Sequence, residues 1–215
     1  MSRLALAFLV SFTSVAAAAG FAKPPPPVED APAALQHHVE LPSRDDVRAA
    51  LIAARAKNLA AFRAYVKLGS FPSNTHVDGL ANVWRDDEDH FCAAATIMKS
   101  GNQALALKIA EENNSLRLAD VEEGEVMSWI LTSGFTQDEL ALIQRPFSPV
   151  VEKPEPAPIL VEVDPDLRRA ETARLRKLYA AIDKQLVAKQ KQSIEVAVDR
   201  LMKNPSVAAR FARRS

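Results

Sequence analysis

The stretch SRDDVRAALIAARAKNLAAFRAYVKLG, residues 43–69, decides the fold. Its apolar side chains recur at helical spacing, and Ser43 with Asp46 three positions later is typical of a helix N-cap. Gly69 follows the last apolar residues, and glycine readily takes the left-handed conformation that ends a helix. These features predict one long amphipathic helix with a glycine cap.

Short elements are expected between this helix and residue 147. Residues 82–85 and 90–93 flank the acidic tetrad 86–89 (Asp-Asp-Glu-Asp), which predicts a short β-hairpin. Residues 102–112 have helical apolar spacing, and the two asparagines that follow can end that helix.

Two more helices are predicted before Pro146. Asp120 is expected to cap the first, which includes residues 126–131 and closes at Gly134. Thr136 with Glu139 predicts a capping box for the second. We therefore expect residues 43–147 to form a small, mainly α core domain with at most one short β-hairpin.

The segment 165–215 is expected to form long, basic, amphipathic helices. Asp164, Pro165 and Asp166 supply an N-cap, a proline at the first helical position and an acidic first turn. Residues 188–193 are nearly all polar, and the apolar stripe returns rotated beyond them, which predicts a bend or break near 189–193. The stripe before the break consists of Leu175, Leu178, Ile182 and Leu186.

The N-terminus predicts export. Residues 1–22 combine Arg3, an apolar run and small residues suited to cleavage, which is typical of a signal peptide. No cysteine follows the run, so the pattern is not that of a lipoprotein, and we expect a secreted or periplasmic protein. Proline-rich residues 23–42 and Pro/Glu-rich residues 148–164 are expected to be linkers.

Composition excludes some functions and reveals a charge division. The chain has 14 Pro and 6 isolated Gly, so Walker A and dinucleotide-binding loops are excluded.

The net charge is zero, yet residues 166–215 hold 13 Lys and Arg against 5 Asp and Glu, a charge of +8 that balances −8 in residues 1–165. This division favours docking of the basic helices on the acidic core or a merely solvated basic face; the alternative is attraction of an anionic membrane or polysaccharide. Nucleic acid is disfavoured because few aromatic side chains accompany the cations.

His90 and Cys92 are the most specific candidates for a catalytic site. On a strand their spacing puts both side chains on one face, and with Asp86 they supply the residue types of a thiol nucleophile, its base and an orienting acid. No oxyanion stabiliser is evident, and a lone cysteine is more often a buried apolar residue. No cofactor or metal is expected: the acidic tetrad lacks the spacing of a calcium loop, and His76, Asp78, His90 and Cys92 match no zinc motif.

Part of the core resembles a group of secreted bacterial proteins that share a small Cys-containing domain of unknown function. The resemblance covers about residues 55–144 and implies secretion and a shared domain, but no substrate. That group would have glycines near Asp89 and Ala95, and this sequence has neither. The matching residues are Arg55, Asn58, Leu59, Phe62, Tyr65, Gly69, Phe71, Pro72, Asn74, Asp86, Cys92, Ala93, Ser100, Gly101, Trp129, Ser133, Gly134, Leu140, Ile143 and Gln144.

The sequence thus predicts an exported, non-enzymatic interaction or structural module. A protein partner or self-association is expected through the C-terminal helices. A thiol-dependent hydrolase using Cys92 and His90 is one alternative, and anionic-surface binding by the basic helices is another. The candidate partner-binding residues are the apolar Leu175, Leu178, Ile182 and Leu186 with the cationic Arg168, Arg174 and Lys177.

Overall fold

Helix α1 (Arg44–Leu68) organises the structure, a computed structural model that describes residues 41–74, 83–145 and 164–213. The Ser43 hydroxyl oxygen accepts the Asp46 N–H at 3.1 Å, and Gly69, at φ 73°, donates its N–H to the Tyr65 carbonyl. Both predicted caps are therefore confirmed. The expected signal peptide and most of the two expected linkers lie outside the described residues.

Short helices follow α1 along the chain: α2 (Ala93–Gly101), α3 (Gln103–Glu112), the 3-10 turn η1 (Leu118–Asp120), α4 (Gly124–Thr132) and α5 (Gln137–Gln144). The capping box of α5 is present as predicted, with Thr136 and Glu139 bonding each other's backbone N–H. Within the described ranges there are eight α-helices and no strand, so the mainly α fold is confirmed.

Two local predictions were wrong. The hairpin is reduced to a single antiparallel bridge between Arg85 and Phe91, because Cys92 caps α2 and the chain turns helical at once. Asp120 ends the 3-10 turn rather than capping α4, which begins at Gly124 after Glu123, with no side-chain cap.

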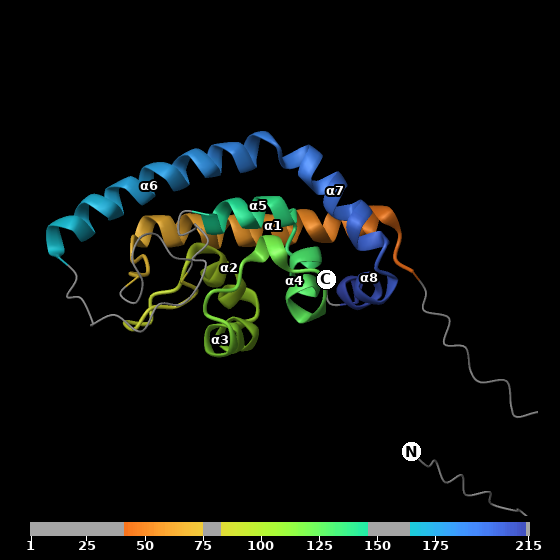
Figure 1. The fold of residues 1–215 in the computed structure, drawn as a ribbon. Helices are drawn as coiled ribbons and strands as arrows, with labels where there is room; N and C mark the ends of the chain where they lie inside the picture. Colours follow the sequence, from red (N-terminus) through yellow and green to blue (C-terminus); the bar gives the residue numbers. More distant parts are fainter. Residues whose placement is uncertain (1–40, 75–82, 146–163, 214–215) are drawn as a thin grey trace, which may run out of the picture. The chain divides into compact units, whose positions relative to one another are not determined.

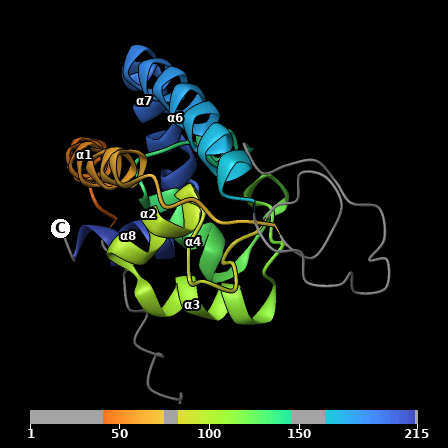
Figure 2. The ribbon, with the colours of Figure 1, turned by 90° about the vertical axis from the view of Figure 1, so that its left-hand side faces the viewer.

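The C-terminal segment forms α6 (Pro165–Ala188), α7 (Gln190–Met202) and α8 (Pro205–Ala212). The Asp164 carboxylate accepts the N–H groups of Asp166 and Leu167, and Lys189 separates α6 from α7, as predicted. Helices α6 and α7 both pack along α1, while α8 contacts α1 and α4 (Figure 1). Figure 2 shows from a second direction that α3 and α6 lie on opposite sides of this helical unit. None of the described helices is both long and apolar enough to span a membrane.

Two apolar clusters account for the break at Lys189. The α6 side chains join a cluster with α2, α3, α5 and the C-terminal half of α1. Within it four aromatic rings meet at centroid distances of 5.1–5.7 Å: Phe62, Tyr65, Phe71 and Tyr179. The α7 and α8 side chains join a second cluster with the N-terminal half of α1. Since the two apolar stripes are rotated relative to each other, the break allows both to be buried.

Ion pairs between α1 and the C-terminal helices reverse the charge pattern expected from the sequence. Arg44 pairs with Asp199 at 2.7 Å, Arg48 with Glu195 at 2.7 Å and Arg63 with Asp183 at 2.9 Å. The cations here come from α1 and the acids from the basic segment 166–215. Overall charge therefore did not reveal which side chains meet.

Candidate functional site: a groove between α3, α4 and α8

The structure separates Cys92 from its predicted catalytic partners. Cys92 is fully buried as the N-cap of α2, where its Sγ accepts the Ala95 N–H at 3.5 Å. Burial raises the pKa of the thiol from 9.0 to about 12, so the thiol is protonated at neutral pH. Among the described residues no hydrogen bond joins His90 to Cys92.

His90 instead belongs to a loop cluster with Asp86 and Glu88. Its Nδ1 lies 3.1 Å from Asp86 Oδ2 and 3.4 Å from Glu88 Oε2. The possible ligand atoms of these three residues lie within 4.8 Å of one another, which a metal ion could use. However, the Arg168 guanidinium already lies 3.4 Å from Glu88 and donates to the Ser73 hydroxyl at 3.0 Å, so the cluster holds the start of α6.

The predicted partner-binding residues are mostly engaged within the chain. Leu175, Ile182 and Leu186 are buried in the first apolar cluster, while Leu178 is 37% exposed. Arg168 is held as just described, Arg174 pairs with Glu171 at 2.6 Å, and Lys177 is exposed. A partner could not reach the three buried leucine and isoleucine side chains in this structure.

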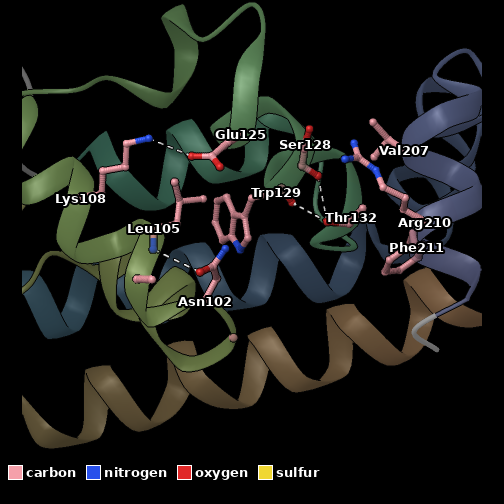
Figure 3. A pocket seen from close by; sticks show the side chains of 12 residues that line it. Asn102, Leu105, Lys108, Glu125, Ser128, Trp129, Thr132, Val207, Arg210 and Phe211 are labelled. Carbon is pink, nitrogen blue, oxygen red and sulfur yellow. Dashed lines mark hydrogen bonds and ion pairs between the residues drawn. The ribbon is translucent and has the colours of Figure 1, made fainter.

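A groove of about 540 Å³ lies elsewhere, between α3, α4 and α8. Figure 3 shows Trp129 of α4 between Lys108 of α3 on one side and Arg210 of α8 on the other. The apolar wall consists of Leu105, Trp129, Val207 and Phe211. This volume falls in the range of ligand-binding clefts, roughly 300–1,000 Å³.

Most polar side chains of the groove are engaged within the chain. Lys108 Nζ lies 3.1 Å from Glu125 Oε2, and this carboxylate raises the pKa of the Lys108 ammonium. The hydroxyls of Ser128 and Thr132 donate to the carbonyls of Gly124 and Ser128 in their own helix, at 3.0 and 2.9 Å. They are therefore satisfied without a ligand.

Arg210 differs from the other polar groups of the groove. Its side chain is exposed, and within the part of the chain that the structure describes it has neither an ion pair nor a hydrogen bond. Across the groove, Asn102 uses its Oδ1 to accept the Leu105 N–H at 3.2 Å. That leaves its amide N–H₂ as a second donor.

Sequence reasoning missed this groove because three segments far apart along the chain build it: 101–108, 125–132 and 207–211. The one local signal was Trp129, since Trp84, the other tryptophan, is fully buried and donates to the Ala106 carbonyl at 3.1 Å. Trp129 is only partly buried, and partly exposed tryptophans are enriched at binding sites.

No protein-family model, curated protein or solved structure matches the chain.

Proposed function

We propose that the protein is an exported, non-enzymatic interaction module that binds a segment of a partner protein in the groove between α3, α4 and α8. One observation carries the proposal: Arg210, with no partner among the described residues, stands beside an apolar wall that includes Trp129. Tryptophan and arginine are the residue types that most often dominate binding energy at protein interfaces. Residues 1–22, which have the pattern of a signal peptide, support export.

The thiol-dependent alternative has less support. A nucleophilic cysteine needs a thiolate, an adjacent base and access to substrate. Cys92 is fully buried, its raised pKa keeps it protonated, and His90 is bonded to Asp86 instead.

Anionic-surface binding is favoured by a different observation, the charge left over on α6. Its three acids, Asp166, Glu171 and Asp183, each pair with an arginine, whereas Lys177 and Lys184 are exposed. Co-sedimentation of the protein with acidic vesicles at low salt tests this candidate. The double variant Lys177→Gln, Lys184→Gln should no longer sediment with the vesicles. No sedimentation of the unaltered protein would remove the candidate.

The groove is tested by selecting peptides that bind the full chain from a random peptide display library. The selected peptides are then synthesised and their affinities are measured. Ala104→Arg places a bulky side chain on an exposed position that lines the groove. Ala180→Arg, its matched control, makes the same change at an exposed position of α6.

We expect Ala104→Arg to weaken binding at least tenfold and Ala180→Arg to leave it unchanged. A failure to select any peptide, or equal affinities for both variants, would overturn the proposed site.

A further inference from the structure

We propose that the groove recognises a peptide segment in which a carboxylate stands next to a large apolar side chain. This inference rests on the proposed function and specifies the chemistry of the partner. The inference follows from the hydrogen-bonding groups and charges of the groove that have no partner within the described part of the chain.

The groove offers donors in excess of acceptors. Arg210 has five N–H donors and no acceptor, and Asn102 keeps its amide N–H₂ because its oxygen caps α3. The hydroxyl protons of Ser128 and Thr132 are already given to helix carbonyls, so their oxygens and the Glu125 carboxylate are the side-chain acceptors of the groove, fewer than these donors. A ligand that supplies acceptors, above all an anionic one, therefore completes the bonding of the groove.

A carboxylate fits Arg210 better than other acceptors do. The guanidinium is planar and can bind both oxygens of a carboxylate, which strengthens the contact and fixes its direction. Glu125 is the acid that lines the groove, and it would repel such a ligand if it were unpaired. Lys108 lies 3.1 Å from Glu125 and offsets part of this repulsion, and both side chains lie on the side of Trp129 away from Arg210.

The apolar requirement follows from the remaining wall. Trp129 lies between the two charged sides, and Leu105, Val207 and Phe211 complete the lining. A carboxylate alone would leave this wall in water, whereas an adjacent aromatic or aliphatic side chain would cover it.

The test uses the library-selected peptides and the full chain. Each winner is synthesised with its acidic residue intact and with that residue replaced by its amide, Glu by Gln or Asp by Asn. Each is also made with a free and an amidated C-terminus, which separates a side-chain carboxylate from a terminal one. Affinities are measured for the unaltered protein, for Arg210→Gln and for Lys203→Gln, a charge-matched control at an exposed position outside the groove.

We expect the selected peptides to combine an acidic residue with a large apolar residue. Amide replacement should weaken binding to the unaltered protein and to Lys203→Gln about three- to fivefold, in the upper part of the range of an exposed ion pair. It should have no effect on Arg210→Gln. If the winners lack a carboxylate, or if amide replacement costs the same in Arg210→Gln, the carboxylate inference fails while a loss with Ala104→Arg still supports the groove. If Ala104→Arg has no effect either, the proposed function fails as well.

Discussion

Arg55 and Glu139 form a bidentate ion pair in the interior, with nitrogen–oxygen distances of 2.7 and 2.8 Å and side chains that are almost inaccessible. Arg55 also donates to the carbonyls of Gly134 and Leu186, and Ser193 donates its hydroxyl to Glu139. One buried pair thus joins α1 and α5 to both sides of the break between α6 and α7. The Leu186 carbonyl lies in the last turn of α6, where carbonyls lack partners within the helix, and Arg55 supplies one.

Breaking this pair should destabilise the protein strongly. Glu139→Gln leaves the Arg55 charge buried without its partner, and we expect a loss of about 3 kcal/mol in the free energy of unfolding, measured with urea. Asp183→Asn is the control, because it breaks the exposed Arg63–Asp183 pair and should cost less than about 1 kcal/mol. Equal losses for the two variants would show that the buried pair does not hold the helices together.

Two glycines with positive φ should respond differently to alanine. Gly134 has φ 78°, and an added Cβ would meet the Leu51 carbonyl oxygen and lie 2.5 Å from the Arg55 nitrogen, both backbone atoms. Gly124 has φ 83°, but its added Cβ would have open space. Gly124→Ala should therefore cost about 1–2 kcal/mol from conformation alone, and Gly134→Ala at least about 3 kcal/mol because α1 must also move. Similar urea midpoints would contradict this close approach.

Stability at alkaline pH should depend on Cys92. Its thiol stays protonated in the folded state up to a pKa of about 12, whereas in the unfolded chain it ionises near 9.0. The contribution to stability is therefore complete below pH 9 and is lost as the pH rises from 9 towards 12. Between pH 8 and 10.5 we expect the unaltered protein to lose about 1–2 kcal/mol more than Cys92→Ala. Identical losses would mean that the thiol is not buried; the tyrosines Tyr65 and Tyr179, whose pKa values burial also raises, affect both proteins alike.

The tryptophans should differ in their access to solvent. Trp84 is fully buried and Trp129 lines the groove, so acrylamide should quench mainly Trp129. Trp129→Phe should lower the quenching constant several-fold and shift the remaining emission to shorter wavelength. Unchanged quenching would mean that Trp129 does not line an open groove.

The parts of the fold that the sequence predicts best are those set by neighbouring residues. The caps at Ser43, Gly69, Thr136 and Asp164 follow from local hydrogen bonding, and the break at Lys189 follows from the rotation of an apolar stripe. The start of α2 was missed because cysteine is not a usual capping residue, so Cys92 gave no recognisable signal.

Long-range contacts could not be predicted from the pattern. Arg55 and Glu139 are 84 residues apart, and the groove joins Asn102 to Phe211. The charge division suggested docking of a basic segment on an acidic core. The Arg168–Glu88 pair has that sense, whereas the pairs at Arg44, Arg48 and Arg63 have the opposite one. Net charge describes the average of a segment, whereas docking depends on which individual side chains meet.

The most direct test of the central claim is hydrogen exchange of the full chain with and without a library-selected peptide. Binding in the groove predicts slower exchange of backbone amides in α3, α4 and α8 and no change in α6, which lies on the opposite side from α3 (Figures 1 and 2). Protection confined to α6 or to the loop around Asp86, with none in α3, α4 or α8, would contradict the claim that this protein binds its partner through the groove.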